Sequence, residues 1–396
     1  MSETDSEPQI EPVPLPSDDE VDLGMPKPEE AQLVVDAMSR AAGGQEGLTP
    51  LQRVLARAVV EAMSGHPVTV GPGRAVGPQE LAEGFRFRNE IHRVRIFHDL
   101  VLCALVRRPL PPEVEQQLTR YAAALSIDDP ILTVVRRLSR GQLGLAMVDF
   151  DRNGYTRDWD AEQARALHTS HELAAAWELA VDDPALAARW RALADLPVGT
   201  LGRAVIDLYR ARGFHVPGSP GSAPPLLAQH DWVHVLADYG TTVENELETF
   251  AFVGRADDDP KGFSLLAMVV GLFETGYLAQ AAGLFESDPG HLAEDGMAVR
   301  VADAMRRGAR CHDDGEVRKD FLAVDWFAYA DRPVDEVRAA FSVPPKSTAA
   351  IVAGSLGPFE PGGISEYQLA AGKELAEAEG RPYEAFGADP AGADPA

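Results

Sequence analysis

The stretch His230-Asp231-Trp232-Val233-His234, followed after eleven residues by Glu246, sets the expected fold of this chain. The two histidines are four residues apart, so on a helix they share one face about one turn apart. Gly240 interrupts the run, and Thr241 with Glu244 has the spacing of a capping box that begins a second helix. Two helices that fold back about Gly240 would place position 234 opposite position 246.

This fold-back predicts a metal centre. The imidazoles of His230 and His234 and the carboxylates of Asp231 and Glu246 would converge. Such a donor set suits zinc or a similar divalent metal, with a position left open for water or substrate. The competing interpretation is a histidine pair that only packs in a core or lies on a helix surface.

Composition limits the classes of protein. The chain has 396 residues, enough for two domains, and it is 45% hydrophobic and 25% charged, as soluble globular proteins are. Its formal net charge is −26, which argues against nucleic acid as a partner. The two cysteines, Cys103 and Cys311, provide neither a disulfide framework nor a cysteine metal site. Arginine in excess of lysine and abundant alanine indicate a bacterial coding bias.

The start of the chain carries neither a signal peptide nor a transit peptide, so we expect a cytoplasmic protein. Ten acids and one lysine lie in residues 1–30. Residues 1–28 are acidic and rich in proline, without an apolar period, and we expect a disordered tail there. A helical domain over 29–160, a metal-binding helical domain over 161–345 and a partly disordered extension over 346–396, loose from about Pro382, complete the expected organisation.

Helix signals dominate the remainder, and strand signals are scarce. Thr49-Pro50 and Gly77-Pro78 are typical helix starts, and Thr200 and Gly213 are typical of the two ends of a third helix. The chain is therefore predicted to be an all-α multi-helix bundle. Its expected helices cover 51–63, 78–106, 111–125, 130–138, 160–179, 201–212 and 297–310, and a short one begins at Pro333.

Two stretches allow a functional and a purely structural interpretation. Residues 149–160 match the first half of a calcium-binding loop, but Arg157 stands where a ligand or water is needed, so a turn between helices explains them better. The helix expected over 263–282 is apolar nearly all round. It is either a buried core helix or one wall of a groove for a lipid tail; it is too interrupted to predict a membrane span.

Three motifs in order carry a resemblance: L-P-x-G-T-L-G-R at 196–203, H-D-x2-H-x11-E at 230–246, and D-W followed by R-P-V-D-E-V-R within 325–338. On these motifs the chain resembles the fourth coenzyme Q (ubiquinone) biosynthesis protein family, over about residues 165–343. The resemblance implies an all-helical fold with His230, Asp231, His234 and Glu246 as ligands of a divalent metal.

The resemblance also implies that an isoprenoid quinone, or its polyprenylated head-group precursor, binds beside the metal. The implied activity is oxidative decarboxylation at ring carbon 1 of the quinone head-group precursor, a polyprenyl hydroxybenzoate-like substrate. A role as a scaffold for other quinone-pathway enzymes, a homodimer, and peripheral contact with the inner face of the membrane are implied as well. Where the family has Arg-x-Arg-Glu and a Glu after the Trp of D-W, this chain has residues 225–229 and Phe327. These departures leave the ligands intact.

Two other classes of function stay open. A metal-dependent phosphohydrolase of the H-D helical type would need a histidine ligand upstream, for which His168, His171 and His215 are candidates, and a distant aspartate. A non-catalytic lipid-binding or assembly protein would use the metal only to hold its fold. Because zinc is redox-silent, an oxidative step would require dioxygen chemistry at a substrate anion or a redox-active metal in its place.

Overall fold

A computed structural model of the chain describes residues 10–71, 74–105, 107, 110–129, 131–139, 183–220, 222, 228–256, 294–311, 321–322 and 324–389. These residues fold into helices, which confirms the predicted all-α class. The single β-type pairing among them is an isolated bridge between Thr200 and Pro333. The chain divides into two compact units, Met1–Gln142 and Leu143–Ala396.

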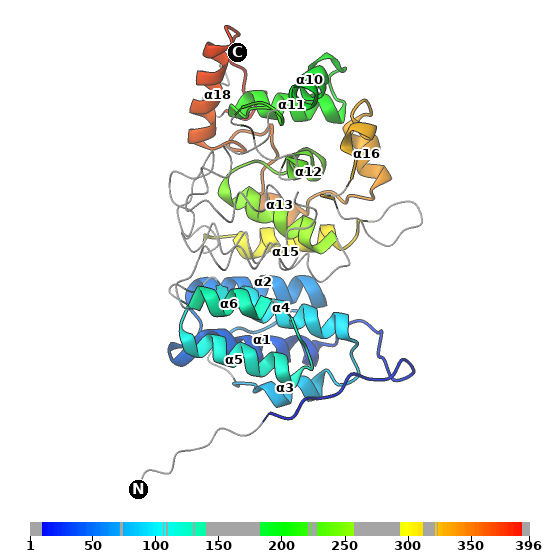
Figure 1. The fold of residues 1–396 in the computed structure, drawn as a ribbon, viewed down its shortest axis with the longest axis vertical. Helices are drawn as coiled ribbons and strands as arrows, with labels where there is room; N and C mark the ends of the chain where they lie inside the picture. The colour runs from blue at the N-terminus through cyan, green and yellow to red at the C-terminus, as the bar shows by residue number, and fades with distance from the viewer. Residues whose placement is uncertain are drawn as a thin grey trace. The chain divides into compact units, whose positions relative to one another are not determined.

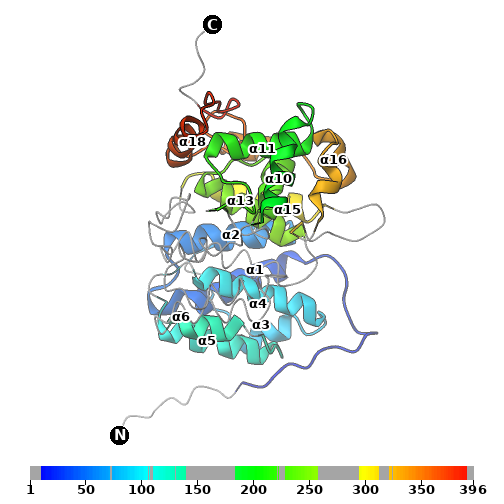
Figure 2. The same ribbon diagram turned by 45° about the horizontal axis from the view of Figure 1, so that its top comes forward.

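The first unit is built around its first helix. α1 (Pro28–Gly43) contacts α2 (Pro50–Ser64), α3 (Pro78–Gly84), α4 (Glu90–Leu105) and α5 (Pro112–Ala124), and α6 (Ile131–Ser139) packs on α5. Figures 1 and 2 show α1 between α2 and α5. The side chains that α1 turns inward are apolar and, apart from Met38, small or branched, which lets its neighbours approach closely: Ala31, Val34, Val35, Ala37, Met38, Ala41 and Ala42.

Thr49-Pro50 starts a helix as predicted. The Thr49 hydroxyl accepts a hydrogen bond from the Gln52 amide at 3.2 Å, and the Gln52 side chain accepts one from the Thr49 amide at 3.0 Å. The two bonds satisfy amides that would otherwise lack partners at the start of α2. Gln52 is itself buried and donates to the carbonyls of Ala42 and Cys103, so this cap also joins α2 to its neighbours.

The predicted single helix over 78–106 is wrong, because the chain breaks between α3 and α4. Asn89 begins the second helix by accepting a hydrogen bond from the His92 amide at 2.9 Å. The carbonyls of Phe85 and Arg88 turn instead toward the buried Arg93 guanidinium, each at 3.2 Å. A buried cation needs acceptors, and an unbroken helix would have used these carbonyls internally.

The disordered tail was expected to reach residue 28, but residues 10–27 make defined contacts. Arg93, fully buried, donates to the carbonyls of Val13 at 2.7 Å and Pro14 at 2.9 Å. Arg88 donates to the carbonyls of Asp22 and Gly24 and pairs with the Glu30 carboxylate at 2.7 Å. The composition of the tail is that of a disordered segment, yet its backbone carbonyls satisfy two arginines that the core buries.

The second unit carries the predicted metal motif. Its helices are α10 (Pro184–Arg191), α11 (Leu201–Arg212), α12 (Gln229–Ala237), α13 (Val243–Ala256), α15 (Met297–Gly308), α16 (Val334–Ala340), α17 (Thr348–Val352) and α18 (Glu366–Ala378), with short 3-10 turns at Ala192–Asp195 and Trp326–Tyr329. α12 contacts α11, α13 and α16, while α15 packs along α13.

α11 ends at Gly213, as predicted. Gly213 adopts φ +71°, a left-handed conformation that closes the helix. A Cβ at this position would lie 2.5 Å from the backbone of Ala371, so glycine also lets α18 pack against the end of α11 (Figure 1). The sequence predicted the turn, and the close approach of α18 is a second reason for glycine there.

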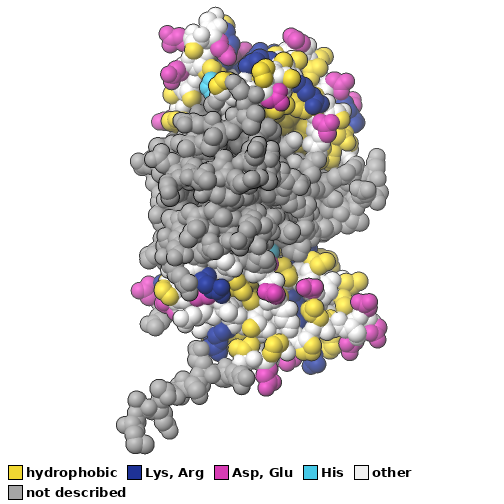
Figure 3. Space-filling model, in the orientation of Figure 1, with side chains coloured by type: hydrophobic (Ala, Val, Ile, Leu, Met, Phe, Trp, Pro, Cys, Tyr) yellow, Lys and Arg dark blue, Asp and Glu magenta, His cyan; other side chains and the backbone are white. Residues whose placement is uncertain are grey.

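Several predictions lie outside the described residues: the calcium-like loop at 149–160, the helices over 160–179 and 263–282, and the domain boundary near residue 160. On the face drawn in Figure 3, acidic side chains are scattered over the described surface and basic ones occur in small groups. Within the described part of the chain, no helix is both long and apolar enough to cross a membrane.

Candidate metal centre

α12 is short and almost entirely buried. Every side chain from His230 to Ala237 is buried, and the helix ends because Asp238 adopts φ +63°. The rings of His230 and His234 lie on one face, with centroids 5.2 Å apart, as the i, i+4 spacing requires. A helix this deeply buried directs both imidazoles into the protein.

The chain folds back after α12 and brings Glu246, in the first turn of α13, against both histidines. Its Oε2 lies 3.5 Å from Nε2 of His230, and its Oε1 lies 3.3 Å from Nε2 of His234. The Glu246 side chain is 2% exposed. Its carboxylate therefore spans the two imidazoles in a site closed to solvent.

The predicted capping box at Thr241 and Glu244 is wrong. The Thr241 hydroxyl donates to Oε1 of Gln368 at 2.6 Å and accepts from Nε of Arg212 at 2.5 Å, so it cannot cap the helix. α13 starts at Val243, one residue later than such a cap would give, and the Thr242 carbonyl accepts from the Glu246 amide at 2.9 Å. The Thr241 hydroxyl bonds to residues that are distant in the sequence, and capping rules consider only residues within the same turn.

His230, Asp231 and His234 form a buried group able to hold a metal ion. Each offers one ligand atom, and these atoms lie within 4.8 Å of one another. Oδ1 of Asp231 lies 3.5 Å from Nε2 of His230, and Oδ2 accepts a hydrogen bond from the Tyr209 hydroxyl at 2.5 Å. Two nitrogen donors with a carboxylate oxygen match the ligands that zinc takes in proteins.

The hydrogen bonds of His234 fix its tautomer. Its Nδ1 lies 2.8 Å from the Gly240 carbonyl and 3.2 Å from the Thr249 hydroxyl oxygen. The carbonyl can only accept, and the Thr249 hydroxyl already donates to the Asn245 carbonyl. Nδ1 therefore carries the proton in the neutral ring, and Nε2 presents a lone pair.

That lone pair is the atom that fits a metal. Nε2 of His234 is fully buried and makes no hydrogen bond, although a carboxylate oxygen lies 3.3 Å away. A lone pair facing an anionic oxygen is unfavourable unless a cation or a proton lies between them. Backbone and hydroxyl oxygens that fix the outer nitrogen of a histidine ring are the usual support of a metal ligand.

The pKa values of the two carboxyls of the centre shift in opposite directions. Burial raises the pKa of Asp231, and the two nearby histidines only partly offset this effect. Burial would also raise the pKa of Glu246, but in the metal-free site positive charge on protonated His234 and His230, which face its two oxygens, outweighs burial and lowers the pKa to about 2. Glu246 is thus the group that remains anionic in the site down to low pH.

Aromatic side chains enclose the centre. Phe250 lies beside the His230 ring, with centroids 5.1 Å apart, and Trp232 packs against Trp190 and Phe327 at 5.4 and 5.3 Å. The guanidinium of Arg189 lies 3.8 Å from the centre of the Phe327 ring. Phe327, which departs from the expected acidic position, thus contributes to an apolar wall behind α12.

The three sequence motifs meet in the fold. The amides of Leu201 and Gly202 donate to the carbonyls of Arg332 and Ala330, at 2.9 and 2.8 Å, so the first motif pairs with the third. Arg338 of the third motif donates to the carbonyls of Leu236 at 2.9 Å and Val235 at 3.0 Å, at the end of α12. The 325–338 segment therefore connects the 196–203 segment with the helix that carries both histidines.

The C-terminal segment holds the turn between the two ligand helices, which the sequence did not predict. The Gly240 amide donates to the Leu356 carbonyl, and the Thr241 amide donates to the Gly363 carbonyl, both at 2.9 Å. The Gln368 side chain donates to the Thr241 carbonyl at 2.9 Å. Ser365, which caps α18, is a sequence signal for that helix, but no local pattern indicates what it contacts.

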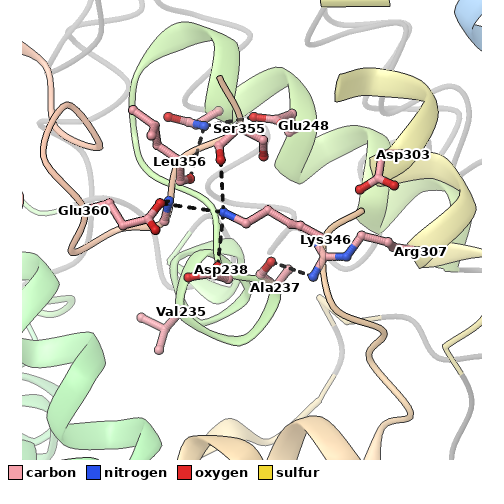
Figure 4. Close-up of polar contacts among 12 residues, drawn as sticks. Val235, Ala237, Asp238, Glu248, Asp303, Arg307, Lys346, Ser355, Leu356 and Glu360 are labelled. Atoms are coloured by element: carbon pink, nitrogen blue, oxygen red, sulfur yellow. Dashed lines mark hydrogen bonds and ion pairs between the residues drawn. The ribbon is translucent and has the colours of Figure 1, made fainter. Parts of the chain in front are cut away.

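A buried lysine contacts the end of α12 and the segment after residue 345 (Figure 4). Nζ of Lys346 lies 3.1 Å from Oδ2 of Asp238, 3.3 Å from the Ser355 carbonyl and 4.0 Å from Oε2 of Glu360. Arg307 donates to the Ala237 carbonyl at 2.8 Å. The end of α12 is thus held by α15 and by the segment that follows residue 345, although the resemblance ends at 343.

Other candidate residues are not brought to the centre. His215 is exposed and is not part of the metal-binding group found among the described residues, while His168 and His171 lie outside those residues. No family model, no curated protein and no solved structure matches the chain. The resemblance to the quinone-biosynthesis family therefore rests on the three motifs.

Proposed function

We propose that the second unit is a divalent metal centre with His230, Asp231, His234 and Glu246 as ligands and zinc as the preferred ion. The observation that carries this proposal is the buried Nε2 of His234, which has no hydrogen bond and faces Glu246 at 3.3 Å. A cation between them would satisfy both atoms. A set of nitrogen and carboxylate donors favours zinc over ions that prefer oxygen ligands alone.

We further propose that the centre binds an isoprenoid-quinone precursor and decarboxylates it at ring carbon 1. The contacts among the 196–203, 230–246 and 325–338 segments support this proposal, because the motifs that carry the family resemblance form one site. The substrate is a hydroxybenzoate ring with a polyprenyl tail. The helix expected over 263–282 is the candidate for contact with that tail, and peripheral contact with a membrane would deliver the lipid.

The reaction breaks the bond between ring carbon 1 and its carboxylate, leaves the electron pair on the ring and replaces carbon dioxide by a proton. A bound divalent ion would hold the carboxylate or a ring oxygen and stabilise negative charge there. The chain itself orients two ligands through Gly240 and Tyr209 and excludes water with Phe250 and Trp232, which strengthens electrostatic interactions in the site.

A non-catalytic role is the second candidate, and one observation favours it. The ligand side chains are almost inaccessible, with His234 at 0% and Glu246 at 2% exposure. Structural zinc sites are closed in this manner, whereas catalytic sites keep one position open. In that case the metal would support a lipid-binding or assembly protein of the quinone pathway.

The test combines native mass spectrometry with a carbon dioxide assay. Native spectra of the purified chain should show a bound divalent ion and a co-purified prenyl lipid. Polyprenyl hydroxybenzoate labelled at its carboxyl carbon should release labelled carbon dioxide with the wild type and with His215→Ala, but not with His234→Ala. Metal without turnover would favour the structural role, and phosphate release from a nucleotide panel would favour a phosphohydrolase instead.

A further inference from the structure

The two oxygens of the Asp231 carboxylate have different surroundings. Oδ2 accepts a hydrogen bond from the Tyr209 hydroxyl at 2.5 Å, while Oδ1 lies 3.5 Å from Nε2 of His230 and faces the other ligands. Both residues are buried, with Asp231 at 5% and Tyr209 at 2% exposure. A carboxylate can bind an ion through one oxygen or two, and here one of them is already engaged.

The Tyr209 side chain is held in place to make this bond. It projects from α11, and its ring packs against Trp190 at 5.0 Å and edge-on against Phe214 at 5.5 Å. A phenol hydroxyl is protonated at neutral pH and a carboxylate oxygen can only accept, so Tyr209 is the donor to Oδ2 of Asp231.

We propose that Tyr209 restricts Asp231 to one metal-binding oxygen and thereby selects a four-coordinate ion such as Zn²⁺ over an ion such as Mn²⁺ that takes more oxygen ligands. If both oxygens bound the ion, the Tyr209 hydroxyl would lose its partner inside the protein, which costs about 1–3 kcal/mol. With Oδ2 withheld, the site offers two imidazole nitrogens, one Asp231 oxygen and Glu246. This inference rests on the proposed metal centre and names the residue that tunes it.

The unit contains a matched control. Tyr239 is also buried, at 1% exposure, but its hydroxyl makes no hydrogen bond to a proposed metal ligand. Changing either tyrosine to phenylalanine removes one buried oxygen and keeps the ring. Only Tyr209→Phe frees a carboxylate oxygen of a metal ligand. A difference in metal affinity between the two variants therefore measures the effect of the hydrogen bond to Asp231, and not the effect of losing a buried hydroxyl.

The experiment measures the affinities of the full-length wild type, Tyr209→Phe and Tyr239→Phe for Zn²⁺ and Mn²⁺, by competition with a chromophoric chelator. Loss of a hydrogen bond to a metal ligand should weaken zinc binding about 10- to 100-fold in Tyr209→Phe. Manganese binding should weaken less, so that the preference for zinc falls. In Co²⁺-loaded Tyr209→Phe, visible absorption per bound ion should drop, as expected when a second Asp231 oxygen joins the ion. Tyr239→Phe should match the wild type.

Equal losses for both ions with an unchanged cobalt spectrum, or no loss at all, would overturn the role of Tyr209 and leave the metal centre intact. If the wild type bound none of the three ions, the proposed metal centre itself would fail, which is a distinguishable result. If Tyr209→Phe does not fold, the coordination number of Co²⁺ in the wild type tests the inference, and the visible spectrum reports that number. The intense absorption of a four-coordinate ion supports the inference, and the weak absorption of a six-coordinate ion refutes it.

Discussion

Nε2 of His234 lies 3.3 Å from Oε1 of Glu246, and no hydrogen bond joins them. The reason is the Gly240 carbonyl, which holds the ring proton on Nδ1 at the opposite side of the imidazole. Two groups with lone pairs thus face each other in a buried site. This arrangement is stable only with a positive charge between them, supplied by a metal ion or a proton.

His234→Ala should abolish metal binding. Elemental analysis should find about one divalent ion per chain in the wild type, as expected for a mononuclear site, and only background levels in the variant. His215→Ala is the control, because it removes an exposed histidine outside the metal-binding group. Equal occupancy in wild type and His234→Ala would show that this imidazole is not a ligand.

Added zinc should stabilise the wild type. An ion that binds only the folded protein adds about 2.7 kcal/mol to the free energy of unfolding at a free concentration one hundred times its Kd. Thermal melts with zinc and after chelation should therefore differ for the wild type and coincide for His234→Ala. A zinc-induced rise of the melting temperature in the variant would place the ion elsewhere.

The metal-free protein should lose stability in acid through Glu246. The pKa of this carboxyl falls from 4.5 to about 2 on folding, so its contribution is fully present above pH 4.5 and is lost as the pH falls toward 2. Asp231, whose pKa is raised, acts in the opposite direction. Urea melts of chelated wild type and Glu246→Gln between pH 6 and pH 3, a range set by these values, should show a steeper acid loss in the wild type. Parallel curves would contradict this assignment.

Gln368→Ala should weaken metal binding from a distance. The substitution removes the partner of the buried Thr241 hydroxyl and carbonyl, which should lower the free energy of unfolding by about 1–3 kcal/mol. It also loosens the turn whose carbonyl orients His234. Glu374→Ala, at an exposed position in the middle of α18, is the control. Because coupling between two sites is reciprocal, removal of the metal by a chelator should increase hydrogen exchange in residues 356–368. Unchanged exchange would show that this segment is not energetically coupled to the metal centre.

Affinity for quinone analogues should grow with tail length if the proposed substrate is right. Burying one isoprene unit of about 100 Å² contributes about 2.5 kcal/mol before ordering costs. A titration with analogues that carry from zero to about four isoprene units should show a steep rise in affinity that then levels off. Affinity independent of tail length would remove the lipid from the proposal.

Local sequence signals predicted much of the helical fold. Thr49-Pro50 and Gly213 lie at helix ends because capping depends on residues within one turn, and Thr200 lies at the predicted helix start although its side chain makes no capping bond. The i, i+4 spacing likewise placed His230 and His234 on one face. Long-range partners escaped prediction: the bonds of Tyr209 to Asp231 and of Gln368 to Thr241 cross 22 and 127 residues. The helix break before α4 also has a long-range cause, since Arg93 draws carbonyls away from a continuous helix.

The buried Arg93 determines how far the acidic N-terminal segment can be shortened. Its guanidinium is satisfied by backbone carbonyls alone, and those of Val13 and Pro14 come from the segment whose composition predicted disorder. A protein that starts at residue 29 would leave a buried cation short of acceptors and open to water. A protease should consequently trim the native chain only ahead of Val13, and the shortest stably expressed form should still include it.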